Sequence, residues 1–176
     1  LNYTSVDALD LGGNKATDKG GGKAEIVLPD PYDQYDSLQY REVRVDTTAP
    51  TINKVTSTKQ DGVYSPGAEI PIEIQFSESV TVEKSPKLKL NTEPERYAEY
   101  IGGSKTRNLV FMYTVQEGDS STGLNYASEN ALTLNGGAIK DDAGNDAVLV
   151  LPAVDSENSL AGSKDIIIDS EVAYVT

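Results

Sequence analysis

The sequence contains no cysteine, no histidine and no tryptophan, and only one methionine. Without cysteine and histidine there can be no thiol nucleophile, no zinc site built on these ligands and no Ser/His/Asp relay. Acid–base chemistry would have to depend on carboxylates, tyrosine or lysine. We therefore expect that the protein is not an enzyme. A glycosidase with a pair of carboxylates is the remaining catalytic alternative, and nothing in the spacing of the acidic residues requires one.

Basic residues are also scarce, with 15 Lys and Arg against 28 Asp and Glu and a formal net charge of −13. This charge repels nucleic acid and anionic membrane surfaces and attracts cations, divalent metals above all. No apolar run approaches the roughly 20 residues of a membrane span, and the N-terminus lacks a basic and then apolar signal pattern. We expect no nucleic-acid partner and no membrane insertion. We interpret the chain as an internal segment of a longer protein.

A repeat with an offset of 123 residues organises the chain. The blocks that recur are Leu1-Asn2-Tyr3 as Leu124-Asn125-Tyr126, Ala8-Leu9 as Ala131-Leu132, Asp18 as Asp141, Val27-Leu28-Pro29 as Val150-Leu151-Pro152, and Asp46 as Asp169. The repeat predicts that residues 1–46 are the C-terminal part of a preceding unit. Residues 47–169 would be a complete unit, and residues 170–176 the start of the next unit or a linker. The alternative is two similar strand–turn units inside one domain.

Apolar and polar residues alternate along most of residues 47–169, which is typical of strands with one buried face. The expected strands are residues 70–76, 80–82, 88–90, 96–101, 109–115, 131–134, 147–151 and 165–168. Glycine-containing turn pairs separate them, and no segment has the apolar stripe of a helix. Seven to nine short strands in about 120 residues predict an all-β fold, an immunoglobulin-like or cadherin-like β-sandwich.

Five sequence blocks carry a family resemblance. They are Val-Asp-Thr-Thr-Ala-Pro-Thr-Ile at residues 45–52, Phe-Ser-Glu-Ser-Val at 76–80, Tyr-Thr-Val-Gln-Glu-Gly-Asp at 113–119, Ala-Leu-Thr-Leu-Asn-Gly-Gly at 131–137 and Asp-Asp-Ala-Gly-Asn at 141–145. In this order they resemble the bacterial Ig-like, cadherin-like repeats of large surface adhesins and secreted calcium-binding proteins. The resemblance implies tandem repeats outside the cell or on its surface, with adhesion, surface-layer or matrix roles.

Acidic residues are densest at positions 141–146, where Asp141, Asp142, Asn145 and Asp146 offer four side-chain oxygen donors. Because Ca²⁺ takes six to eight oxygen ligands, this loop predicts a structural calcium site. The alternative is an ordinary Asp/Asn/Gly turn whose side chains cap the backbone. In the corresponding earlier loop Asp18 remains, but lysines at 19 and 23 replace two donors, so we expect that loop to have lost its ion.

Further candidate calcium ligands lie near the unit boundaries. Asp46 and Asp169 each precede the next unit, and Glu78 interrupts a run of apolar residues. The resemblance to cadherin-like arrays implies ions at such junctions that hold consecutive domains rigid. The alternatives are a turn before Pro50 for Asp46 and a charge at a strand-edge bulge for Glu78. The residues after Asp169 do not repeat the Thr-Thr-Ala-Pro sequence that follows Asp46.

These observations predict a structural or adhesive module of a long extracellular repeat protein or filament, stiffened by Ca²⁺. The alternative is a specific binding module for carbohydrate or a protein partner on a cell surface, in which Tyr32, Tyr35 and Tyr40 contact glycans. We more readily expect the tyrosines to be strand residues, with Tyr3 and Tyr126 as corner tyrosines whose hydroxyls bond nearby backbone.

The expected partners are neighbouring repeats or subunits of the same protein. Residues 1–46 would hold only closing strands, and their apolar side chains would stay exposed: Leu9, Leu11, Ile26, Leu28, Val43 and Val45. The missing strands would belong to a longer chain or come from a neighbouring subunit by strand complementation. A third alternative is a permuted frame, in which residues 1–46 pack against residues 47–123 and leave residues 124–169 incomplete.

Overall fold

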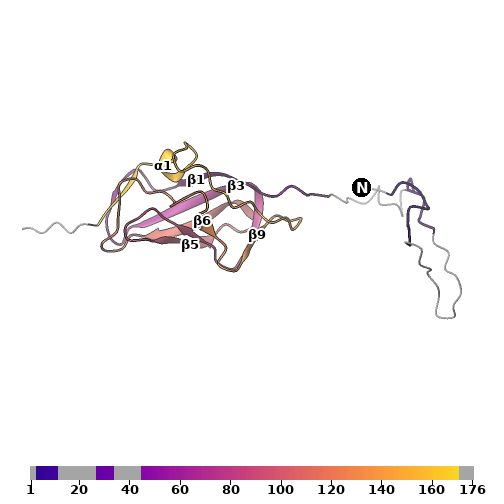
Figure 1. The fold of residues 1–176 in the computed structure, drawn as a ribbon, viewed down its shortest axis with the longest axis horizontal. Coiled ribbons are helices and arrows are strands. Elements are labelled where there is room, and N and C mark those ends of the chain that lie inside the picture. Colours follow the sequence, from indigo (N-terminus) through magenta and orange to yellow (C-terminus); the bar gives the residue numbers. More distant parts are fainter. Residues whose placement is uncertain (1–2, 12–26, 34–44, 171–176) are drawn as a thin grey trace, which may run out of the picture. The chain divides into compact units, whose positions relative to one another are not determined.

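The computed structural model describes residues 3–11, 27–33 and 45–170. Contacts between Cα atoms divide the chain into two compact units, Leu1–Asp46 and Thr47–Thr176, called unit 1 and unit 2 below. All the helices and strands of the described residues lie in unit 2 (Figure 1). None of these helices is long and apolar enough to cross a membrane.

Unit 2 is an all-β structure with one short helix. Its elements are β1 (Ile52–Ser57), β2 (Gly62–Tyr64), β3 (Glu69–Glu83), β4 (Lys87–Lys89), β5 (Tyr97–Gly102), β6 (Thr106–Thr114), β7 (Ser120–Ser121), β8 (Leu132–Thr133), β9 (Ala138–Lys140), α1 (Leu160–Ser163) and β10 (Ile166–Asp169). The all-β prediction is therefore confirmed.

The strands form two sheets. The seven-stranded sheet has the order β1-β3-β6-β5-β4-β8, and β9 pairs with β3 outside this path. Every pair in it is antiparallel. In the second sheet, of order β2-β10-β7, β10 is parallel to β2 and antiparallel to β7.

The alternation predicted for the long strands places one face of each in the core. Ile70, Ile72 and Ile74 of β3 are fully buried and lie opposite Tyr113, Phe111 and Leu109 of β6. Ile166 and Ile168 of β10 belong to the same buried cluster, so both sheets share one core. Burying each such side chain stabilises the fold by about 1.5–3 kcal/mol, which makes this the main stabilising contribution.

Two of the expected strands differ in the structure. Residues 70–76 and 80–82 belong to one strand, β3, whose pairing with β6 shifts register between Gln75 and Val80. The strand expected at 147–151 is wrong, because this segment makes only an isolated parallel bridge between Val148 and Thr51. Its amides donate instead to separate loops, Val148 N to Pro50 O and Leu151 N to Glu129 O.

Several elements were not predicted, namely β1, β2, β7, β9 and helix α1. Strands β2, β7 and β9 have only two or three residues, which is too few to show a period of two. Helix α1 is a single turn, capped by the Ser159 side chain, which accepts a hydrogen bond from Gly162 N.

The closing part of unit 2 pairs with the rest of that unit. Strand β8 pairs with β4, β9 with β3, and β10 with both β2 and β7. Residues 124–169 are therefore completed by residues 47–123, and the permuted frame is wrong.

Four hydrogen bonds of unit 1 recur in unit 2 with the offset of 123 residues. The bond from Tyr3 OH to Pro29 O matches the one from Tyr126 OH to Pro152 O. Among backbone bonds, Leu28 N to Val6 O matches Leu151 N to Glu129 O, and Ala8 N to Ser5 O matches Ala131 N to Ser128 O. In the same way, Asp33 N to Asp30 O matches Ser156 N to Ala153 O. Both corner tyrosines thus bond backbone carbonyls, as predicted. At these hydrogen bonds, residues 3–8 and 28–33 have the local conformation of residues 126–131 and 151–156.

Some of the apolar side chains predicted to be exposed in unit 1 are exposed, and others are not. Leu9 and Val45 are exposed, whereas Leu11 and Leu28 are half-buried. Ile26 and Val43 lie outside the described residues.

Candidate metal site

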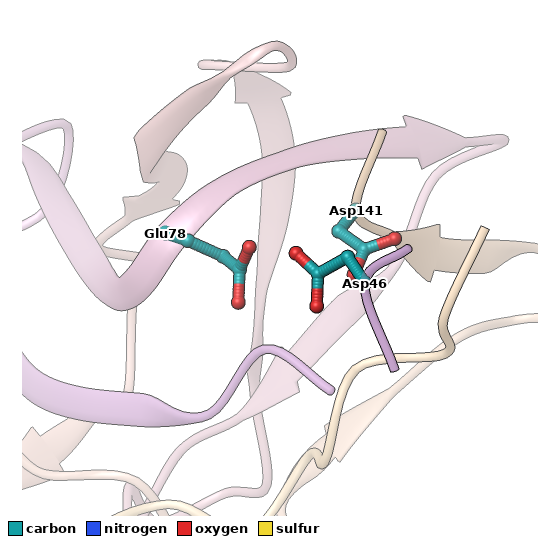
Figure 2. A group of neighbouring side chains, drawn as sticks. All are labelled: Asp46, Glu78 and Asp141. Atoms are coloured by element: carbon teal, nitrogen blue, oxygen red, sulfur yellow. The ribbon is translucent and has the colours of Figure 1, made fainter. Parts of the chain in front are cut away.

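Three carboxylates from distant parts of the sequence converge on one point. One oxygen each of Asp46, Glu78 and Asp141 lie within 4.8 Å of one another, and Figure 2 shows the three groups pointing toward each other. Asp46 directly precedes Thr47, Glu78 lies in β3, and Asp141 follows β9. Among residues 3–11, 27–33 and 45–170, no other group of three or more possible metal ligands lies this close together.

Strand pairing explains why these three residues meet. Strand β1 is antiparallel to β3 with Ile52 opposite Phe76, so the residues before Ile52 run alongside those after Phe76. Ser77 N donates to Thr51 O and Thr51 N donates to the Ser77 hydroxyl, which fixes this crossing. Strand β9 pairs Lys140 with Thr81, so the residue after it approaches the same part of β3.

Asp141 is the buried member of the group, and its carboxylate is held by its own loop. It accepts hydrogen bonds from the backbone N and from Nδ2 of Asn145, at 2.8 and 2.7 Å. Burial alone would raise the pKa of Asp141, but the hydrogen bonds from Asn145 and from the backbone N–H groups of the loop outweigh it and lower the pKa below its usual value of 3.8. Asp141 is therefore ionised and oriented at neutral pH.

The other predicted ligands do not join this group. Asp142 is exposed, and Asp146 forms an ion pair with Lys140 at 2.9 Å. Asn145 turns its amide nitrogen toward Asp141, so this loop makes the capped turn that was the alternative interpretation. Asp169 ends β10 opposite Ser120. Asp18 and its neighbouring lysines lie outside the described residues.

The electrostatics of the group favour a bound cation. The three negative charges repel one another at this spacing, and a cation between them would offset that repulsion. Oxygen donors of this kind suit hard divalent cations such as Ca²⁺, which complete their shell with carbonyls and water. The residues present therefore fit calcium.

A second charged cluster, which the sequence did not reveal, has a structural role. Asp119 is fully buried and accepts hydrogen bonds from Arg96 Nε at 2.7 Å and from the Tyr113 hydroxyl at 2.6 Å. Burial and the hydrogen bond to Asp119 raise the pKa of Tyr113. Asp119 O also accepts from the Ser170 hydroxyl, so this cluster ties the end of unit 2 to the turn before β7.

A hollow of about 500 Å³ lies beside β10. It contains two carboxylates, Glu93 and Asp169, and no aromatic side chain. Both residues pair with Ser120 from opposite sides, so their backbones are separated by two strand spacings, about 9–10 Å. Neither is buried.

Of the tyrosines considered for glycan contact, Tyr32 is exposed, and Tyr35 and Tyr40 lie outside the described residues. Comparison with protein-family models, with curated proteins and with solved structures found no match to this chain.

Proposed function

We propose that the chain is a structural and adhesive part of a long extracellular or cell-surface repeat protein, made of tandem Ig-like β-sandwich units. Ca²⁺ bound by Asp46, Glu78 and Asp141 stiffens the start of each unit. The observation that supports this most is the convergence of these three carboxylates within 4.8 Å.

The donor chemistry supports calcium over softer metals. The site offers only oxygen, and the chain has no cysteine or histidine that could favour zinc or copper. An acidic chain with a formal charge of −13 also attracts divalent cations electrostatically.

The position of the site supports a stiffening role. Asp46 belongs to the segment that leads into Thr47, whereas Glu78 belongs to β3 and Asp141 directly follows β9. An ion shared by the three residues would hold the incoming segment against β3 and β9 and reduce its conformational freedom. Asp169 stands at the equivalent of Asp46 in the 123-residue repeat, so it would serve a following unit in the same way.

Calcium should therefore stabilise the folded chain by mass action, by about 2.7 kcal/mol at a concentration of 100 Kd. Thermal unfolding of the 176-residue chain, measured in calcium and in chelator, should show a higher Tm in calcium. Glu78→Gln should remove most of this difference. Glu69→Gln, an exposed carboxylate at the other end of the same strand, is the matched control and should keep it.

Two results would contradict the proposal: an equal Tm in calcium and in chelator, or an equal loss of the calcium effect in both variants. The first would remove the metal, and the second would mean that overall charge, not this group, is responsible.

A further inference from the structure

The turn between β8 and β9 contains the dipeptide Asn135-Gly136, and no other asparagine of the chain is followed by glycine. Asn135 has a φ of 50° and Gly136 a φ of 74°, and Gly137 N donates to Leu134 O at 2.9 Å. Positive φ at both central residues is the mark of a type I′ turn, in which Asn-Gly is strongly preferred. The sequence therefore favours this turn over other connections.

The Asn135 carboxamide is open to reaction with the nitrogen that follows it. Asn135 and Gly136 are both exposed, and Gly136 has no side chain to shield its backbone nitrogen. The Asn135 side-chain amide donates to Ser85 O at 3.4 Å, which is longer than a typical N–H···O bond of roughly 2.7–3.2 Å. Lys84 Nζ would lie 3.6 Å from a Cβ atom at Gly136, and a positive charge so near favours loss of the Gly136 amide proton.

We propose that Asn135 is a site of spontaneous deamidation, and that its isoaspartyl product releases β9 from β3. The Gly136 N–H loses its proton to solvent, and the nitrogen bonds to Asn135 Cγ. The bond from Cγ to Nδ2 breaks, and ammonia leaves with a proton from solvent. Water then opens the cyclic imide. Cleavage between the nitrogen and Cγ gives aspartate, whereas cleavage between the nitrogen and the backbone carbonyl carbon gives isoaspartate.

The turn itself limits the rate of the first step. In a type I′ turn the first central residue has a ψ of about +30°, which directs the next nitrogen away from its side chain. The Asn135 Cα–C bond must therefore rotate, and the turn must open, before Gly136 N reaches Cγ. The pairing of Ala138 with Glu83 at the start of β9 resists this opening.

Isoaspartate does not fit the closed turn. Its main chain runs through Cβ and Cγ and is one atom longer than before. Gly137 has no room to shift, because a Cβ atom there would lie 2.0 Å from Glu83 O and 3.1 Å from Leu134 O. Since β9 has only three residues, a displacement at its start affects every pair it makes with β3. The inference goes beyond the proposed function and does not need the metal.

The test is a warm incubation of the 176-residue chain in chelator, at mildly alkaline pH, with and without urea. Mass spectrometry of peptides follows the conversion of each asparagine to an acid. In the folded chain Asn135 should be converted several-fold faster than any other asparagine. Urea should accelerate its conversion several-fold further, because it opens the turn.

Hydrogen exchange measures the consequence for β9. The aspartyl and isoaspartyl forms of the aged chain are separated by chromatography, and exchange is followed at the amides of Gly137 and Ala147. Ala147 N donates to Ile139 O of β9, and Val115 N, which donates to Ala68 O, reports on the rest of the fold. In the isoaspartyl form Gly137 and Ala147 should exchange several-fold faster than in the fresh chain, with Val115 unchanged. The aspartyl form should keep the protection of the fresh chain.

Asn135→Gly is the matched variant, because Gly-Gly also suits a type I′ turn but carries no carboxamide. After the same incubation it should keep its protection at Gly137 and Ala147. Asn130→Ser, a change at another exposed asparagine, should lose protection as the native chain does.

Three results would overturn the inference: conversion of another asparagine as fast as Asn135 in the folded chain, full protection of Gly137 and Ala147 in the isoaspartyl form, or an equal loss of protection in aged Asn135→Gly. Because every measurement is made without calcium, a failed metal proposal does not alter the outcome.

Discussion

At the scale of single residues, Asp141 is held as an anion by hydrogen bonds made only in the folded chain. Its pKa is lowered below 3.8, so the stability it contributes is present above the unfolded value and is lost as pH falls through the folded value. We predict that Asp141→Asn lowers the Tm at neutral pH in chelator and weakens the loss of stability below about pH 4. Acid titration followed by circular dichroism measures both. Asp142→Asn, an exposed change in the same loop, should do neither.

Arg96 is the residue whose removal should leave a buried charge without compensation. Its guanidinium is about one-third exposed, but its partner Asp119 is fully buried. Breaking a buried pair costs about 3–5 kcal/mol, and the exposure of Arg96 reduces this to roughly 2–3 kcal/mol. We predict this loss for Arg96→Met in urea unfolding. Arg107→Met, at an exposed position, should change the stability by less than about 0.5 kcal/mol. Similar losses in the two variants would contradict the structural role of the Arg96–Asp119 pair.

At the scale of elements, the pairing of β9 with β3 depends on a close approach at Gly137. A Cβ atom there would lie 2.0 Å from Glu83 O, so the turn before β9 would have to move. We predict that Gly137→Ala destabilises the fold by about 1–3 kcal/mol. It should also weaken calcium binding, because β9 positions Asp141. Gly123→Ala, where a Cβ meets no atom within 4 Å, is the control. Calorimetry with and without calcium would show an unchanged metal response in Gly137→Ala if β9 does not position the site.

The same scale shows how much the sequence could predict. Strands β3 and β6 were predictable because they are long enough for the alternation of apolar and polar residues to show a period of two. Strands β2, β7 and β9 were not predictable, because they have only two or three residues and form through pairing with strands distant in the sequence. Asp46, Glu78 and Asp141 could each be named as candidates. Their meeting could not be predicted, since it follows from the register of β1 and β9 on β3.

At the scale of the whole unit, we predict that the parallel pairing of β2 with β10 is a point at which unit 2 resists mechanical force. In Figure 1 the chain enters this unit beside β9 and leaves it from β10 at the opposite end. The chain reaches β2 only after β1, so a pull loads the β2–β10 pair directly when it is applied at the start of β2 and at the end of β10, in opposite directions. Since the two strands are parallel, such a pull shears all their evenly spaced hydrogen bonds at once.

The lack of native cysteine allows this load to be redirected with single attachment points. With one handle beyond Thr176, a second at Gln60→Cys pulls on the start of β2 and should shear the pair. A second at Ser65→Cys pulls on the end of β2, next to the end of β10, and should peel the bonds apart one by one at a several-fold lower force. Both positions are exposed, so neither handle disturbs the core. Equal unfolding forces would exclude this clamp, whereas a lower force for the handle at Ser65 would mean that the three residue pairs between β2 and β10 bear the load in unit 2.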